Sequence, residues 1–331
     1  MNLGSIFNNI ERSLLGKKRV EYFIGICVIL FFFILPLFTD SPYVLRMFSL
    51  TFIYVMAAMS FRVITLSGQI PLAHAGFMGI GAYCAAMLSK WLGWPFWANL
   101  FIAAIVTTLI GVVIGFTFSR LRSLYYAMGS LFFGIGIISV IAVGGKLTGG
   151  GTGLAGIQPI FTNATHNFYL LLGLTLFIIL ILYRFEYCRI GIKIKAVEQS
   201  YKIASSVGIN ERYYRVLAVG VGCFFVGIAG ACYAHLNTVV VPSSFNLNAT
   251  LWLAIYVLVG GGNHFLGPIV GTFVLQFIPQ YFFRGFQMYS PFVSALLLLI
   301  VVYLLPKGMV SLPQVIKSKI KRKSIVHASR N

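Results

Sequence analysis

Acidic side chains are scarce in this chain. Asp and Glu together number six, against 25 Lys and Arg, and charged residues make up 9% of the 331 residues. All six acids fall outside the long apolar runs; they are Glu11, Glu21, Asp40, Glu186, Glu198 and Glu211. A carboxylate at mid-bilayer costs roughly 2.5 to 3.5 kcal/mol on insertion scales, and transporters that keep one there usually use it for proton or cation coupling. The sequence therefore disfavours an ion-coupled secondary transporter.

Residues for catalysis and metal binding are also few and scattered. The five cysteines form no CxxC pair and mostly lie within apolar runs, which favours buried fillers over metal ligands or disulfides. The five histidines lie in separate segments, although His74 and His264 could still approach each other in space. No Walker A sequence is present, so nucleotide binding is not expected. We predict no metal site and no cofactor, and an integral membrane enzyme is disfavoured.

What the chain does have is long apolar sequence, with 59% hydrophobic residues. About ten runs reach or approach the roughly 20 residues that a helix needs to cross a bilayer. Backbone amides in lipid must be satisfied within the segment, so the predicted fold is all-α and polytopic. The third, eighth and ninth runs are weak enough to be re-entrant or broken. The predicted spans are 22–38, 44–66, 70–89, 96–118, 124–143, 168–183, 215–236, 249–262, 265–283 and 290–305.

The basic residues predict the orientation of these spans. With an even number of spans, all but four of the 25 Lys and Arg lie on the side that holds both termini; the four are Arg46, Lys90, Lys146 and Arg284. The positive-inside rule then places both termini in the cytoplasm. The net charge of +19 is mainly a topology signal, and no nucleic-acid partner is expected.

This topology divides the chain into three parts. Residues 1–21 form a cytoplasmic leader without a cleavage site, residues 22–305 a membrane domain, and residues 306–331 a basic cytoplasmic tail. The membrane domain carries a large cytoplasmic loop at 184–214 and a glycine-rich outer loop at 144–167.

Three places interrupt the apolar pattern. The first contains Gln69, His74, Gly76, Gly79 and Gly81. Its small residues would let a neighbouring helix approach closely, and its amide and imidazole would lie near the cytoplasmic side. Packing is the simpler explanation for each residue alone, but such a segment is also typical of a gated solute path.

The second interruption is in the outer loop, at Thr148, Gly149, Gly150 and Gly153. It is either a flexible connector or a docking surface for an outer partner; a phosphate-binding loop is disfavoured because no Gly-Lys-Ser/Thr ending follows.

The third interruption contains Gly260, Gly261, Gly262, Gly267 and Pro268. It is either a tight turn between two helices or the unwound middle of a discontinuous element.

The cytoplasmic loop contains a helical pattern. Apolar residues recur with helical spacing on one face, and polar residues line another; the apolar positions are Ile194, Val197, Tyr201, Ala204 and Gly208. This pattern predicts one short amphipathic helix. Such a helix would either lie on anionic lipid or dock into a cytoplasmic protein.

Taken together, these motifs resemble one family, the membrane permease subunits of ABC-type branched-chain amino-acid importers, which include the LivM-like permeases. The resemblance runs from about residue 45 to 310 and is specific only as a set. It rests on Leu66-Ser67-Gly68-Gln69, His74-Ala75-Gly76-Phe77, Gly79-Ile80-Gly81-Ala82-Tyr83, Leu147-Thr148-Gly149-Gly150, Gly208-Ile209-Asn210, Ala229-Gly230, Gly260-Gly261, Gly267-Pro268 and Pro306-Lys307-Gly308.

The resemblance implies a permease in the inner membrane of a bacterium. Its partners would be a second related permease, two cytoplasmic ATPases that bind the ATP, and an extracytoplasmic solute-binding protein. Urea and short amides use similar permeases and are the alternative cargo. The outer loop would lie near the binding protein. The residues implied for the ATPase coupling helix are Gly191, Ala196, Val197, Glu198, Gln199, Tyr201, Ala204 and Gly208.

Overall fold

The computed structural model describes residues 32–36, 41–121, 123–262, 264–282, 290–304 and 309. The predicted leader 1–21, most of the predicted span 22–38 and the tail 306–331 apart from Met309 lie outside the described residues. The cytoplasmic location of both termini therefore stays a prediction.

The described chain is almost entirely helical. Two-residue strands β1 (Leu154–Ala155) and β2 (Val239–Val240) pair antiparallel, with Leu154 opposite Val240. The helices are α2 Pro42–Thr65, α3 His74–Leu92, α4 Phe96–Phe118, α5 Ser123–Val143, α6 Gly145–Thr148, η1 Gly150–Thr152, α7 Ala164–Tyr187, α8 Arg189–Gln199, α9 Tyr201–Ser206, α10 Glu211–Asn237, η2 Pro242–Phe245, α11 Leu247–Gly260, α12 Gly267–Thr272, η3 Phe273–Phe277, α13 Ile278–Phe282 and α14 Ser290–Leu304.

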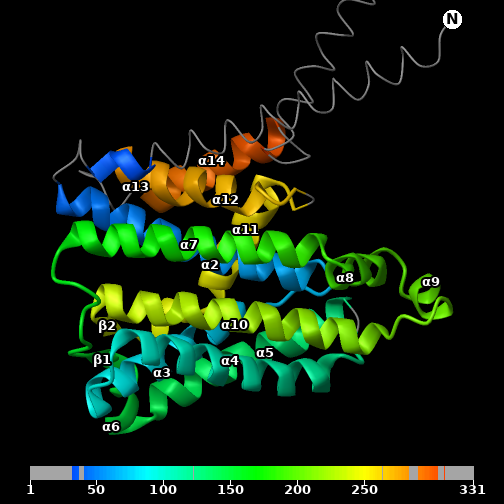
Figure 1. Ribbon diagram of the computed structural model, residues 1–331, viewed down its shortest axis with the longest axis horizontal. Coiled ribbons are helices and arrows are strands. Elements are labelled where there is room, and N and C mark those ends of the chain that lie inside the picture. Colours follow the sequence, from blue (N-terminus) through cyan, green and yellow to red (C-terminus); the bar gives the residue numbers. More distant parts are fainter. Residues whose placement is uncertain are drawn as a thin grey trace, which may run out of the picture.

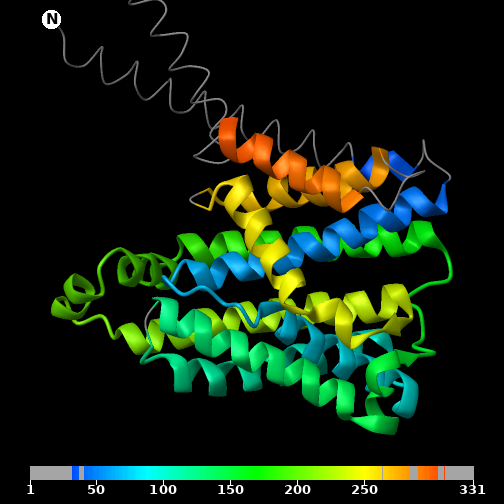
Figure 2. The same cartoon turned by 180° about the vertical axis from the view of Figure 1, so that it is seen from behind.

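The long helices run side by side in two layers (Figure 1). One layer contains α2, α7 and the helices from α12 to α14, and the other contains α3, α4, α5 and α10. The short helix α11 crosses obliquely between the layers (Figure 2). One end of the bundle carries α8 and α9, and the opposite end carries α6 and the two strands (Figure 1).

Six of the described helical segments are long and apolar enough to cross a membrane: Pro42–Thr65, Phe96–Phe118, Leu124–Val143, Ala164–Tyr187, Glu211–Asn237 and Pro242–Gly260. The predicted number of about ten spans is not confirmed. The segments expected to be weak are irregular: α3 starts only at His74, and α11 has 14 residues. The ninth predicted span contains a π-helical stretch, η3, between α12 and α13.

Close packing around α3 and α10 depends on glycine. A Cβ on Gly81 of α3 would lie 2.6 Å from the carbonyl oxygen of Gly227, and a Cβ on Gly230 of α10 would collide with the carbonyl oxygen of Met78. Helices that span a membrane gain little from hydrophobic association, so close van der Waals contact between backbones is a main source of their stability. The small residues around Gly81 therefore serve helix packing.

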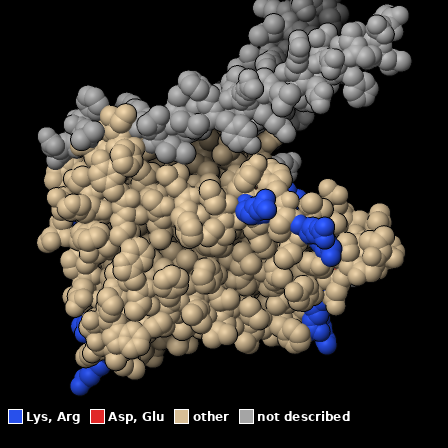
Figure 3. Space-filling model, viewed as in Figure 1, with Lys and Arg blue, Asp and Glu red and all other residues tan. Residues whose placement is uncertain are grey.

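On the face shown in Figure 3, the exposed basic side chains lie toward the two ends of the bundle. The α8 end holds Arg62, Arg120 and the basic residues of the 184–214 loop, and Arg46 lies at the opposite end, where it donates to Asn237 Oδ1 at 3.2 Å. The sorting of the described basic residues into two groups matches the two ends of the fold.

The glycine contacts predict a clear mutational result. Gly230→Ala should destabilise the protein by about 1–3 kcal/mol, because the added methyl group overpacks the α3–α10 contact. The melting temperature of the detergent-solubilised protein should fall. Gly173→Ala is the matched control, since a Cβ on Gly173 meets nothing within 4 Å. An equal fall in both variants would contradict the packing role of Gly230.

Candidate functional site

Two helices begin inside the bundle rather than at its ends. Residues 66–73 leave the end of α2 as non-helical chain, and α3 starts at His74. Likewise, the chain after β2 returns into the bundle through η2, and α11 starts there at Leu247. The first turns of the two helices touch, because the Ala75 N–H donates to Thr250 Oγ1 at 3.1 Å. The structure thus contains a pair of partial helices whose N-termini meet.

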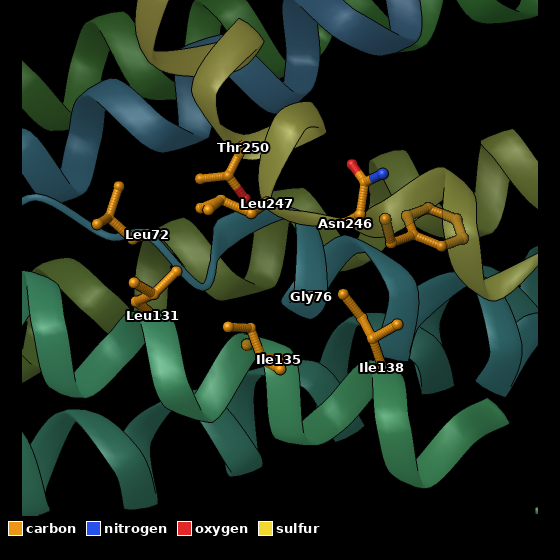
Figure 4. Close-up of a pocket in the computed structure, with 10 residues that line it drawn as sticks. Leu72, Gly76, Leu131, Ile135, Ile138, Asn246, Leu247 and Thr250 are labelled. Atoms are coloured by element: carbon orange, nitrogen blue, oxygen red, sulfur yellow. The ribbon is translucent and has the colours of Figure 1, made fainter. Parts of the chain in front are cut away.

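A small recess lies where these helices meet α5, with a volume of about 10 Å³, room for about one water molecule. Its α5 side is formed by Leu131, Gly134, Ile135 and Ile138, which occupy the middle of the Ser123–Val143 helix. Leu131, Ile135 and Ile138 point from α5 toward Leu247 and Thr250 on the opposite wall (Figure 4). Leu72, Gly76, Phe245 and Asn246 complete the lining. The recess is therefore aliphatic on its α5 side and lies midway along a helix long and apolar enough to cross a membrane.

The two helix N-termini give this apolar recess a polar character. The N-terminus of a helix carries a partial positive charge and unpaired N–H groups, which favour an anionic group nearby. Asn246 caps α11, with its Oδ1 accepting from the Ala249 N–H at 3.0 Å. The Ala75 and Ala249 N–H groups at these helix starts are thus already paired within the protein, and the recess is closed to a cargo in this conformation.

A polar strip leads from the β2 end of the bundle toward the recess. It consists of the exposed residues Ser243, Ser244, Asn246 and Asn248, between β2 and the first turn of α11. Such groups facing lipid would lack hydrogen-bond partners, so this face suits a water-filled path. The sequence analysis missed this strip and the α5 residues. The available signal was a run of four polar residues within six positions, next to an apolar segment.

Of the first group of predicted gate residues, only Gly76 lines the recess. His74 is buried against α2, where its Nε2 lies 2.9 Å from Ser60 Oγ and 3.2 Å from the Ala57 carbonyl oxygen. Gln69 is buried in the 66–73 segment and accepts from Ser67 Oγ at 3.3 Å. The ring of Phe245 covers Gly79, and Gly81 packs on α10.

The second group of predicted gate residues forms a tight turn between α11 and α12, away from the recess. The backbones of Gly260 and Gly267 touch, Gly261 has a φ of 111°, and Pro268 stands in the first turn of α12. The structure thus places these residues in the connection between α11 and α12, and their part in a gate stays a prediction. The carbonyl oxygen of Gly262 accepts from Arg62 Nε at 3.1 Å.

The predicted single amphipathic helix in the 184–214 loop is wrong in one respect. It is two helices, α8 and α9, because Ser200 is extended and its Oγ accepts from the Ile203 N–H to cap α9. The predicted apolar face is buried at Ile194, Val197 and Ala204. Of the remaining predicted coupling positions, Ala196 and Tyr201 are half-buried, and Glu198, Gln199 and Gly208 are exposed.

Gly191 makes the sharp connection between α7 and α8 possible. It is buried, and a Cβ at this position would collide with the carbonyl oxygens of Phe185 and Glu186. The start of α8 is thereby held directly against the last turn of α7.

A buried ion cluster lies at the same place. Glu186 belongs to the last turn of α7, which extends beyond the predicted span 168–183, and it is 3% exposed. Its carboxylate pairs with both terminal nitrogens of Arg62 on α2, the second at 3.0 Å, and with Lys195 Nζ on α8 at 2.8 Å. Glu186 therefore joins α2, α7 and α8.

The outer glycine-rich loop is a folded turn. Thr148 Oγ1 donates to the Ile141 carbonyl oxygen at 2.7 Å, and Gly149, Gly150 and Gly153 all have positive φ. A Cβ on Gly153 would collide with the carbonyl oxygen of Val240 in β2. The loop is therefore anchored to α5 and to the chain that leads into η2.

Comparisons with known proteins agree on one family. Residues 43–302 match the family described as branched-chain amino acid transport system / permease component. The chain belongs to this permease family. No solved structure matches it.

Two curated relatives of the permease carry the same description, "High-affinity branched-chain amino acid transport system permease protein LivM". They come from Salmonella typhimurium and Escherichia coli. Each is 28% identical over 295 residues, which cover 79% of this chain and 68% of the relative. With six long apolar segments, the permease is a multi-pass membrane protein.

The ion cluster predicts how the permease responds to loss of one charge. Arg62→Met leaves the buried Glu186 carboxylate with Lys195 alone, and breaking a buried pair in this way costs about 3–5 kcal/mol. The double variant Arg62→Met/Glu186→Leu removes both buried charges and should recover most of this loss. Melting temperatures in detergent measure both. A double variant less stable than Arg62→Met would contradict the prediction.

Proposed function

We propose that this permease forms the translocation path of an ATP-driven ABC importer for branched-chain amino acids, in the inner membrane of a bacterium. Its partners are a second related permease, two ATPase subunits that bind the ATP, and an extracytoplasmic solute-binding protein. The observation that carries the proposal is the small recess at the middle of α5, framed by the starts of α3 and α11, where a path would open between the two layers. Family membership and the names of the two relatives support it.

The chemistry of the recess suits this cargo. A branched-chain amino acid has an aliphatic side chain and a carboxylate, and the recess has aliphatic walls on its α5 side and two helix N-termini; α5 and α11 would have to separate to admit it. The polar strip of Ser243, Ser244, Asn246 and Asn248 gives the cargo an approach from the outer end, where the folded glycine-rich loop offers a surface for the binding protein. The second permease would close the open side of the recess.

The α8–α9 segment is the proposed contact with an ATPase. α9 projects beyond the ends of the other helices (Figure 1). It carries Ile203, and Val207 follows directly; these side chains are 67% and 69% exposed. Large apolar side chains on a projection outside the membrane mark a protein contact. A separate ATPase also agrees with the lack of a Walker A sequence in this chain.

The proposed path is tested by filling the recess. Leu131→Trp places a larger side chain between α5 and α11, so leucine uptake by the reconstituted complex should fall at least tenfold. Phe132→Trp is the matched control, because Phe132 is the next residue of α5, is 68% exposed and does not line the recess. Equal uptake by the two variants would place the path elsewhere.

The same assay separates the alternatives. The wild-type complex should accumulate leucine only with ATP, and excess valine or isoleucine should compete while urea should not. Competition by urea or acetamide alone would favour a short-amide permease. Accumulation by the two permeases without ATPases would favour an ion-coupled carrier.

The proposed ATPase contact is tested on α9. Ile203→Asp should reduce co-purification of the ATPase subunits in mild detergent at least fivefold, because it places a charge in an apolar contact. Ser205→Asp adds the same charge about 200° around the helix, on the other side of α9, and should leave co-purification near the wild-type level. Retention of the ATPases by the Ile203 variant would exclude α9 as the main docking element.

A further inference from the structure

The α8 helix is linked to both partial helices that frame the recess. One link runs through the ion cluster. Lys195 on α8 and Arg62 on α2 bind the same Glu186 carboxylate, and Arg62 Nε also donates to the Gly262 carbonyl oxygen, just after the last residue of α11. The guanidinium therefore connects the α7–α8 junction to the end of α11.

The second link runs through the segment that precedes α3. Gly68 has a φ of 77°, and a Cβ on it would lie 3.4 Å from Glu198 Cγ and 3.5 Å from Glu198 Cα. The last turn of α8 thus packs directly on Gly68 of the 66–73 segment, six residues before α3 starts at His74. A displacement of α8 acts on the chain leading into α3 and, through Arg62, on the end of α11.

We propose that Arg62 is a positioning residue that transmits movement of α8 to α11, so that the ATPase-driven displacement opens and closes the recess. This inference rests on the proposed function. Arg62 does not touch the recess. It acts through Glu186 and Gly262.

The chemistry of the side chain fits this role. Arginine has five N–H donors in a rigid planar fork, which can hold a carboxylate with two nitrogens and a carbonyl with the third. Arg62 holds the Glu186 carboxylate with its two terminal nitrogens and the Gly262 carbonyl with Nε. The side chain is 2% exposed. Its guanidinium carbon lies 5.8 Å from the centroid of the Phe265 ring in the α11–α12 connection. A lysine has a single ammonium and cannot hold both groups in a fixed geometry.

A purely structural ion cluster is the competing explanation, and the double variant separates the two. Arg62→Met/Glu186→Leu removes the buried charges together, so the protein should keep its ATPases and its melting temperature close to wild type. If Arg62 transmits movement, leucine transported per ATP hydrolysed should fall at least fivefold in this variant. Arg62→Lys should also lower this ratio, because it retains the charge and loses the bond to Gly262.

Two further variants keep the test decisive. Lys195→Met breaks the contact between α8 and Glu186 and leaves the contact between Arg62 and Glu186 in place. The Lys195 side chain is 34% exposed, so its loss should leave the fold intact. The amount of leucine transported per ATP hydrolysed should fall by a smaller factor than in Arg62→Met/Glu186→Leu. The control removes another ion pair near the same end, Glu211 and Arg215, which lie in one helix at 3.7 Å. Glu211→Gln/Arg215→Met should leave the ratio unchanged.

The outcomes are distinct. An unchanged transport-to-hydrolysis ratio in assembled Arg62→Met/Glu186→Leu and Lys195→Met complexes would overturn the proposal for Arg62. A ratio that falls equally in the Glu211/Arg215 control would do the same, because it would show a general effect of charge loss. Failure of the proposed function itself would appear earlier, as an absence of ATP-dependent uptake by the wild-type complex.

Discussion

The carboxylate of Glu186 is a charge removed from water. The positions of α2, α7 and α8 depend on keeping that charge paired with basic side chains. Burial of an ion costs several kcal/mol unless partners with good geometry compensate. Arg62 and Lys195 provide that compensation from two other helices, so α2, α7 and α8 cannot move apart freely. Gly191 strengthens the constraint because only a residue without a Cβ fits between α8 and the last turn of α7.

A second constraint comes from the two segments inside the bundle that are not α-helical. In lipid, unpaired backbone groups are tolerated only where protein or water satisfies them. Residues 66–73 and 241–246 are sheltered in this way: the Leu72 N–H donates to Ser130 Oγ at 3.1 Å, and Phe245 packs on Gly79. The recess lies between these two segments. Ser130 of α5 holds the chain before α3, and Gly79 of α3 holds the chain before α11.

Much of the fold follows from the sequence, and the reasons are local. Long apolar runs predict α4, α5, α7 and α10, because length and hydropathy are sufficient to identify a membrane helix. The helical spacing of Ile194, Val197 and Ala204 also predicts their burial correctly. Ser200 was missed as a break because serine caps a helix only in the right backbone conformation, which spacing alone does not reveal.

The site was predicted less well, since it depends on contacts between distant segments. Glycines marked the right regions, yet Gly79 and Gly81 serve packing, and of the predicted glycines only Gly76 lines the recess. The partnership of Arg62 with Glu186 joins residues 124 positions apart, and no local pattern indicates it. The α5 wall is made of ordinary Leu and Ile, whose role comes from position.

The interruption at Ser200 has a bearing on how such a permease could change partners over time. Ser200 has a φ of −161°, so α9 is attached to α8 by one extended residue and not by a continuous helical backbone. Substitutions in α9 can then reorient the exposed Ile203 and Val207 without altering the contact of α8 with Glu186. If α9 docks on an ATPase as proposed, the sequence of that contact can change while the ion cluster of Arg62, Glu186 and Lys195 stays intact.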